Sequence, residues 1–279
     1  MAVCVGVGMK AKPVVRWPGG KTRMLSKILP LVRPHNLYVE AFAGGLALLL
    51  AKLRSPGEVV NDINGDLVNL YRHAQYHMDA LIEECRWTLS SREELEGLID
   101  QPGLTGLQRA ARFLLRNRMS FGGGGTNFAV SRQGQPSREN VLEALRELNK
   151  RLDKVSVESL PWERLLGLYD GPHTLWFFDP PYAAGKVDNY GLWDQETMGA
   201  FAAKVRKLEG DWIVTVNDSP ENRALFAGHE IQPVTTRSGT VNRRLATDAT
   251  FGELLIRRRM RKAVSGALPS HKMELRQAA

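Results

Sequence analysis

An aspartate, two prolines and a tyrosine end an apolar run at 177–182, which reads FFDPPY. Proline lacks a backbone N–H and pushes the residue before it into an extended conformation, so the two prolines stop any strand ladder. The run therefore predicts a buried strand whose tip carries polar side chains. Asp179, Pro180, Pro181 and Tyr182 are the first candidates for a reactive site.

These four residues suit the methylation of an exocyclic amine. The lone pair of such an amine is delocalised into its ring, and two acceptors that bind the amine hydrogens favour a pyramidal nitrogen with its lone pair directed outward. The Asp179 carboxylate and the Pro180 carbonyl can serve as those acceptors and stabilise the positive charge that develops on nitrogen. Tyr182 offers an aromatic face on which a base rotated out of its duplex can stack. The alternative is that two prolines only terminate a strand.

A glycine turn, AFAGG at 41–45, follows one predicted strand and precedes a predicted helix. Its glycines let a ligand or a neighbouring helix approach the backbone closely. Asp62 stands at the tip of the next predicted strand, where a carboxylate can accept hydrogen bonds from ribose hydroxyls. The alternatives are a tight structural turn and an aspartate that only caps a helix.

The segment WPGGKT at 17–22 resembles part of a phosphate-binding loop. That loop requires a glycine at position 15, where this chain has Val15, so we do not expect a nucleoside triphosphatase. Trp17 beside two glycines and Lys21 can form the lip of a ligand site, with the indole available for stacking. The alternative is a tryptophan that closes an edge of the core before a turn.

The composition indicates a globular protein with a polyanionic partner. The 279 residues are 43% hydrophobic, and 38 Lys plus Arg against 30 Asp plus Glu give a formal charge of +8, which favours nucleic acid. Cys4 and Cys85 are too few for a disulfide framework and lack zinc-site spacing, so we expect a reducing cytoplasm and no metal. No apolar run reaches the ~20 residues that cross a bilayer, so we expect no membrane contact. Met9 is an alternative start to Met1.

Four apolar runs predict buried strands, and amphipathic stretches lie between them. This alternation predicts an α/β fold with a mostly parallel sheet covered by helices, in which ligands bind beyond the carboxyl ends of the strands. Two runs near the end, 230–236 and 251–258, are typical of a hairpin that adds an antiparallel edge. The four strand runs are LYVEAFAGG (37–45), EVVNDING (58–65), TLWFFDPPY (174–182) and DWIVTVNDSP (211–220).

Residues 75–160 break the alternation, because four amphipathic helices are predicted there in series. Ser137 is the expected N-cap of the last helix. Before it lies a glycine-rich, basic stretch, SFGGGGTNFAVSRQGQPS at 120–137, which we expect to form a loop or hairpin. The predicted organisation is a catalytic, cofactor-binding domain at 9–74 and 161–260, an inserted helical target-recognition domain at 75–160, and a basic, disordered tail at 261–279.

Taken in order, these motifs resemble those of the Dam-type DNA adenine N6-methyltransferases, the alpha-ordered D12 class, over about 14–258. That family opens with Lys-Trp-x-Gly-Gly-Lys, matched here by RWPGGK, and its Phe-x-Gly-x-Gly is represented by 42–46, with Leu46 at the second glycine. The resemblance implies a Rossmann-like fold, S-adenosyl-L-methionine as cofactor, and direct methyl transfer to adenine N6 in flipped-out double-stranded DNA. It places these residues at the cofactor: Trp17, Lys21, Glu40, Phe42, Ala43, Gly44, Gly45, Asp62 and Asp179.

The segment RNRMSFGGGGTNF at 116–128 is similar to the family's Asn-Arg-x-x-x-Asn-Gly segment, which precedes its recognition hairpin. Arginines near this loop and in the late hairpin are expected to contact DNA, mostly at phosphates. The alternative for any one of them is a solvated surface charge. The residues expected at DNA are Arg116, Asn117, Arg118, Arg132, Arg138, Arg243 and Arg244.

Other functions stay open at this point. An exocyclic-amine methyltransferase can act instead on cytosine N4, an RNA base or a protein glutamine, although an acid at position 179 favours adenine. A catalytically inactive DNA-binding relative is the alternative from another class. We expect a monomer or weak dimer, with a cognate restriction endonuclease as a candidate partner, in a bacterial cytoplasm and encoded by the host or by a phage.

Overall fold

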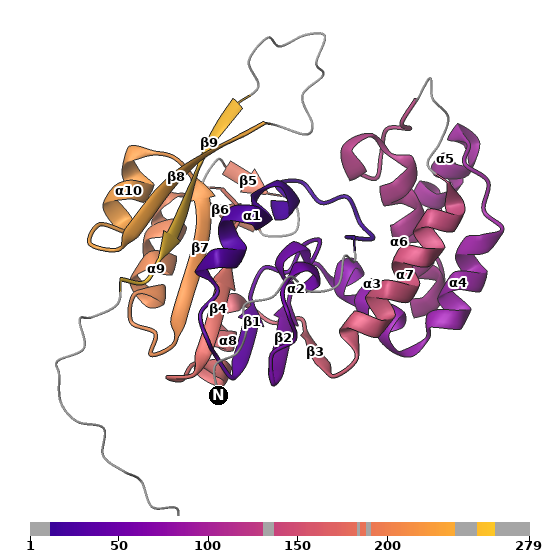
Figure 1. The fold of residues 1–279 in the computed structure, drawn as a ribbon. Helices are drawn as coiled ribbons and strands as arrows, with labels where there is room; N and C mark the ends of the chain where they lie inside the picture. The colour runs from indigo at the N-terminus through magenta and orange to yellow at the C-terminus, as the bar shows by residue number, and fades with distance from the viewer. Residues whose placement is uncertain (1–11, 131–136, 183–184, 188–190, 238–249, 260–279) are drawn as a thin grey trace, which may run out of the picture.

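The computed structural model describes residues 12–130, 137–182, 185–187, 191–237 and 250–259. Its centre is a seven-stranded sheet with the order β3-β2-β1-β4-β7-β9-β8 (Figure 1). The first five strands in that order are parallel, and β9 runs antiparallel to both β7 and β8. The strands are β1 (Leu37–Glu40), β2 (Gly57–Asn61), β3 (Val155–Glu158), β4 (Thr174–Phe178), β7 (Asp211–Asn217), β8 (Glu230–Arg237) and β9 (Thr250–Arg257).

This arrangement confirms the predicted Rossmann-like α/β fold with an antiparallel edge. The central strands are apolar without a break because both faces of the sheet are covered. Successive side chains of a strand point to opposite faces, so Trp176 and Phe178 of β4 pack in one hydrophobic cluster and Phe177 in the other. The continuous apolar run before Asp179 is therefore a strand that fills two cores at once.

Helices cover the two faces in two groups. The cluster that contains Trp176 is closed by α8 (Trp162–Tyr169), α9 (Gln195–Val205) and the end of α10 (Pro220–Leu225). The cluster that contains Phe177 includes residues of α2 (Ala47–Ala51), α3 (Gly65–Tyr76) and the helical segment that follows. Two short strands, β5 (Gly185–Val187) and β6 (Gly191–Trp193), pair in antiparallel fashion between β4 and α9.

The helical segment contains the four helices that the sequence predicts, on the right in Figure 1. Thr105 closes a capping box on the third of them, whereas Ser137 occupies the N-cap position of the fourth without a side-chain cap hydrogen bond. The segment also holds a strand that sequence patterning missed, since β3 pairs with β2 at one edge of the sheet. The helices are α4 (Met78–Arg86), α5 (Arg92–Asp100), α6 (Gly106–Met119) and α7 (Arg138–Leu152).

A buried ion cluster joins α7 to the sheet. Glu58 of β2 accepts hydrogen bonds from Lys52 and from both terminal nitrogens of Arg151, and all three residues are at most 5% exposed. Arg151 Nε also donates to the carbonyl of Leu49 over 3.0 Å. The cluster thus fixes the end of the helical segment against β2 and α2.

The described ranges of the chain contain neither a candidate membrane span nor a candidate metal site. No helix there has the length and apolar character needed to cross a membrane. Within the same ranges, no group of His, Cys, Asp and Glu side chains is arranged to hold a metal ion.

Candidate active site

A cavity of about 750 Å³ lies where β1 and β4 end. Parallel strands bring their carboxyl ends to one edge of a sheet, so the turn after β1 and the DPPY segment after β4 meet there. The segment around Trp17 and the glycine-rich loop after α6 complete the walls. The predicted residues that line the cavity are Trp17, Lys21, Glu40, Phe42, Ala43, Gly44, Gly45, Arg116, Asn117, Asp179, Pro180, Pro181 and Tyr182.

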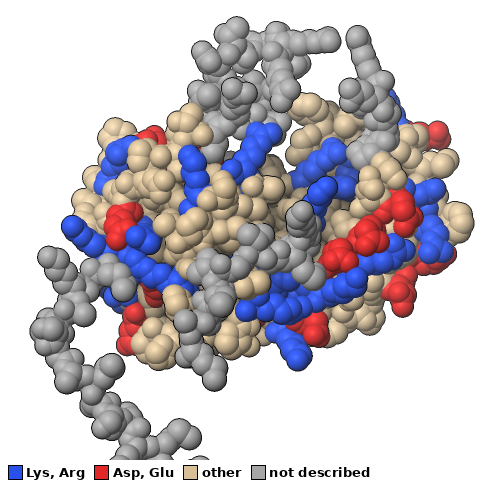
Figure 2. All heavy atoms as spheres, viewed as in Figure 1, with Lys and Arg blue, Asp and Glu red and all other residues tan. Residues whose placement is uncertain are grey.

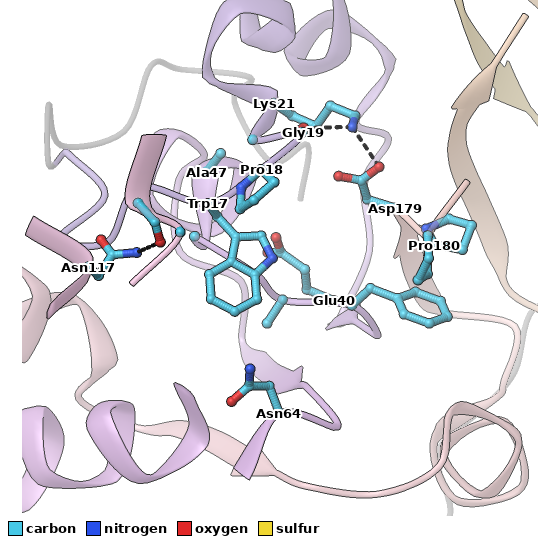
Figure 3. Close-up of a pocket in the computed structure, with 18 of the residues that line it drawn as sticks. Trp17, Pro18, Gly19, Lys21, Glu40, Ala47, Asn64, Asn117, Asp179 and Pro180 are labelled. Carbon is cyan, nitrogen blue, oxygen red and sulfur yellow. Dashed lines mark hydrogen bonds and ion pairs between the residues drawn. The ribbon is translucent and has the colours of Figure 1, made fainter. Parts of the chain in front are cut away.

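Trp17 contacts the glycine turn directly. Its indole projects into the cavity between Asn117 and Glu40 (Figure 3). Gly44 has a φ of +43°, and a Cβ on it would lie 2.7 Å from Trp17 Cδ1. Leu46 also has a left-handed backbone, with a φ of 59°, at the N-cap of α2. The turn therefore follows a path that favours glycine at position 46 as well, although the buried Leu46 side chain fills the core.

Asp62 lies behind the turn rather than on the cavity wall. It is 1% exposed, and its two oxygens accept hydrogen bonds of 2.9 Å from the N–H groups of Gly44 and Asn64. The carboxylate thereby holds the glycine turn in place. Its expected contact with a ribose remains a prediction.

Asp179 is held by two residues that are distant in sequence. Lys21 Nζ lies 2.7 Å from Asp179 Oδ1, and Thr215 Oγ1 of β7 donates to the same oxygen over 2.8 Å. Lys21 is 4% exposed and donates a second hydrogen bond to the carbonyl of Gly19 (Figure 3). Among the described residues, no donor is found on Asp179 Oδ2. The carboxylate thus has one oxygen anchored and one available.

Tyr182 and Glu253 complete this group. The Tyr182 hydroxyl is 3.5 Å from Lys21 Nζ, and Glu253 Oε2 of β9 is 3.8 Å from the same nitrogen. Burial, the charge of Asp179 and a hydrogen bond with Glu253 raise the pKa of Tyr182, so its hydroxyl stays protonated. Sequence reasoning missed Thr215 and Glu253. The sequence signal that could have identified Thr215 is a hydroxyl residue inside the apolar run IVTV.

Glu40 is a buried carboxyl group on the cavity wall. It is 2% exposed, and its Oε2 accepts hydrogen bonds from the Tyr38 hydroxyl and the Leu49 N–H. Burial raises the pKa of Glu40 to about 8, although those two hydrogen bonds partly oppose the rise. The group is therefore largely neutral at pH 7.

The cavity suits a cofactor with an aromatic base and charged ends. Its volume falls in the range of small-ligand sites, and its walls combine the rings of Trp17, Phe42 and Phe177 with carboxyl groups. A side chain at position 44 would fill the space against Trp17. The residues present thus fit S-adenosyl-L-methionine, which carries an adenine, a ribose, an ammonium group and a sulfonium.

The residues expected at DNA divide into several groups. Asn117 joins two loops, since its amide bonds the N–H and carbonyl of Arg16 and the carbonyl of Gly123. Arg138 donates to the carbonyl of Arg86 at the end of α4. Arg116 donates to the Gly125 carbonyl on the cavity wall. Arg132, Arg243 and Arg244 lie outside the described residues.

Arg118 has an unusual setting beside the glycine-rich loop. Burial and the neighbouring charge of Arg16 lower the pKa of Arg118. Its buried Nε has no hydrogen-bond partner among the described residues. Two neighbouring cations of this kind are suited to an anion such as a phosphate.

A Rossmann-like sheet with a DPPY motif at the mouth of a cofactor-sized cavity defines a methyltransferase-like enzyme. The model of the D12 class N6 adenine-specific DNA methyltransferases matches residues 17–237, so the chain belongs to that family of adenine-specific enzymes.

Individual relatives agree with this assignment. A type II methyltransferase, M.MjaIII, of Methanocaldococcus jannaschii is 28% identical over 62% of this chain and 70% of its own length. The type II methyltransferase M1.LlaDCHI of Lactococcus lactis subsp. cremoris is 30% identical over 53% of each chain. A DNA adenine methylase of Haemophilus influenzae is 22% identical over 81% of this chain and 86% of its own length.

Proposed function

We propose that this protein transfers a methyl group from S-adenosyl-L-methionine to N6 of an adenine flipped out of double-stranded DNA. The observation that carries the proposal is the state of Asp179, whose Oδ1 is anchored by Lys21 and Thr215. Its Oδ2 then accepts one hydrogen of the amine, and the Pro180 carbonyl accepts the other. Bound S-adenosyl-L-methionine supplies the methyl group on a sulfonium.

Different residues of the chain bind the cofactor and the flipped base. Trp17, Phe42 and the turn at 43–45 hold the cofactor, and Glu40 offers a carboxylate to its ammonium group. Tyr182 stacks on the flipped base, which is worth roughly 1–3 kcal/mol. Hydrogen-bond acceptors that bind the amine more strongly as it becomes charged stabilise the transition state more than the bound substrate. They therefore lower the barrier to methyl transfer.

Double-stranded DNA approaches the mouth of the cavity along basic loops. Arg118 and Arg16, next in sequence to the cavity-lining Asn117 and Trp17, supply a half-buried pair of cations, and Arg116 lines the wall. Lys and Arg side chains are spread over the face drawn in Figure 2, in its upper middle as well as across its lower half. Contacts of this kind bind the backbone and do not select a sequence.

Incubation with methyl-labelled cofactor and unmethylated duplex DNA tests the proposal. Label on adenine N6 is expected, whereas label on cytosine N4, or on no DNA base, contradicts it. Asp179→Asn should lose turnover and keep DNA affinity, which excludes a protein that only binds DNA. Sequencing the methylated bases of a plasmid from an expressing host identifies the recognition sequence. A restriction partner is identified if an inactive variant, expressed together with a neighbouring nuclease gene, is toxic to the host.

A further inference from the structure

Lys21 has acidic groups on two sides, and only one of them belongs to DPPY. Its ammonium contacts Asp179 at 2.7 Å and lies 3.8 Å from Glu253, which comes from the antiparallel edge of the sheet. Lys21 and Glu253 are 4% and 8% exposed as whole residues. Three charged groups in so little water interact far more strongly than they would at the surface.

The charges of this group do not cancel. With Lys21 protonated and both carboxyl groups ionised, Lys21, Asp179 and Glu253 together carry a net charge of −1. Without Glu253, the ion pair of Lys21 and Asp179 alone would be neutral. The excess negative charge beside Asp179 therefore originates from a strand that carries no recognised motif.

We propose that Glu253 is a positioning residue for methyl transfer, which shares the Lys21 ammonium with Asp179 and so keeps the site beside the amine negatively charged. The inference rests on the proposed function. In that reaction the amine lone pair forms the N–C bond, the S–C bond breaks with its electron pair left on sulfur, and the amine then releases a proton. One positive charge thus moves onto the nitrogen next to Asp179, where a net charge of −1 stabilises it.

The same arrangement holds Tyr182. Its hydroxyl lies 3.5 Å from Lys21 Nζ and hydrogen-bonds with Glu253, so the stacking ring is tied to the same ammonium. β9 reaches this place because it pairs with β7, where Asn217 is opposite Glu253 and Thr215 lies two residues earlier. The antiparallel edge of the sheet therefore supports Asp179 and Tyr182, the two residues that contact the target base in the proposed reaction.

Glu253→Gln removes the charge and keeps the size of the side chain, and Glu230→Gln is the matched control in the same hairpin. Glu230 pairs with Arg257 and is far more exposed. Two measurements are made on each protein: the single-turnover rate of methylation, and the calorimetric affinities for S-adenosylmethionine and for the neutral S-adenosylhomocysteine. Glu253→Gln should slow turnover about tenfold or more and reduce the preference for the sulfonium roughly threefold or more, and Glu230→Gln should change neither.

Glu253→Asp separates charge from shape, because it keeps the carboxylate and shortens the side chain. It should retain more of the rate and of the sulfonium preference than Glu253→Gln. If Glu253→Asp is no better than Glu253→Gln in either measurement, or if Glu253→Gln keeps the wild-type rate and sulfonium preference, the inference is wrong. If the wild-type protein methylates no DNA, the proposed function fails, and the cofactor preferences still test the role of Glu253.

Discussion

Thr215 Oγ1 and Asp179 Oδ1 are 2.8 Å apart, and Lys21 approaches the same oxygen of Asp179. Because both donors use one oxygen, the plane of the carboxylate is fixed and its second oxygen points away from them. A reactive acid at a strand tip would otherwise rotate freely about its side-chain bonds. β7, the neighbouring strand, therefore helps to aim a group that belongs to β4.

Thr215→Val tests this relationship, because it removes the hydroxyl and keeps the shape. A hydrogen bond to a charged group contributes about 1.5–3 kcal/mol, so we expect the single-turnover rate to fall about 10- to 100-fold. The affinity for cofactor, measured by calorimetry, should stay close to wild type. Thr215→Ser keeps the donor and should retain most of the rate; equal loss in both variants would point to packing instead.

Glu40 predicts that cofactor affinity depends on pH. Burial raises the pKa of Glu40 to about 8, so the free protein holds a proton there at pH 7. A cofactor with an ammonium group favours the ionised carboxylate, and its binding therefore releases that proton. Affinity should rise as the pH increases to about 8 and then level off.

Calorimetry at pH 7 in buffers of different ionisation enthalpy measures the released proton directly. Glu40→Gln cannot ionise, so it should release no proton at this site and bind with little dependence on pH between 6 and 9. Equal proton release by Glu40→Gln and wild type would assign the proton to another group.

Gly44 predicts a steric requirement at the cofactor turn. Gly44→Ala would place a Cβ 2.7 Å from the Trp17 ring at a φ of +43°, which an alanine tolerates poorly. We expect at least about tenfold weaker cofactor binding by calorimetry, because Trp17 must move from the cavity wall. Gly228→Ala is the control, since it also replaces a glycine of positive φ (+88°), but its Cβ would meet no atom within 4 Å and Gly228 does not line the cavity.

Sequence patterning is reliable here where a strand is buried on both faces. β4 and β7 stand out because every residue of their central runs fills a core, and the prolines at 180 and 181 mark where β4 ends. β3 was missed because only the first of its four residues is buried and only two residues separate it from a long helix. Thr215 and Glu253 could not be assigned to the site, because their proximity to Asp179 depends on strand order, which no local pattern encodes.

Lys21 shows the same limit at the level of one side chain. Its place in WPGGKT implies a cofactor contact, and it does line the cavity. Its ammonium, however, is directed to Asp179 and the Gly19 carbonyl. A motif can assign a residue to a site, but the direction of a flexible side chain depends on which acid lies nearest in the folded chain.

The setting of Arg118 predicts that its charge lowers the stability of the fold and increases the affinity for DNA. Burial of its guanidinium and the neighbouring charge of Arg16 both lower the pKa of Arg118, so Arg118→Met should leave the melting temperature unchanged or raise it. The same change should weaken DNA binding and reduce the slope of log K against log salt by about one. Arg146→Met is the control, because Glu139 and Glu143 already compensate that charge. An unaltered salt slope would remove Arg118 from the DNA contacts.

The ion cluster predicts a large loss of stability when Glu58 is changed, because this acid pairs with two buried cations. Burial by itself raises the pKa of Glu58, but the hydrogen bonds from Arg151 and Lys52 outweigh it and hold the pKa below its usual value. Glu58→Gln leaves Lys52 and Arg151 buried without their acid, so the free energy of unfolding should fall by about 3–5 kcal/mol at pH 7. Urea denaturation measures the change, and Glu147→Gln, in an exposed pair with Lys150, should cost less than about 1 kcal/mol.

The pH dependence of the stability lost in Glu58→Gln identifies the cause of that loss. A carboxyl group with a lowered pKa stabilises the fold above its unfolded pKa of about 4, and this contribution disappears as the pH falls through the folded value. The gap between wild type and Glu58→Gln should therefore close in acid, where Glu58 is protonated in the wild type as well. A gap that stays constant down to pH 2 would mean that shape, rather than charge, is what Glu58 contributes. Because Arg151 also bonds the carbonyl of Leu49, whose N–H bonds Glu40, the variant should weaken cofactor binding along with the fold.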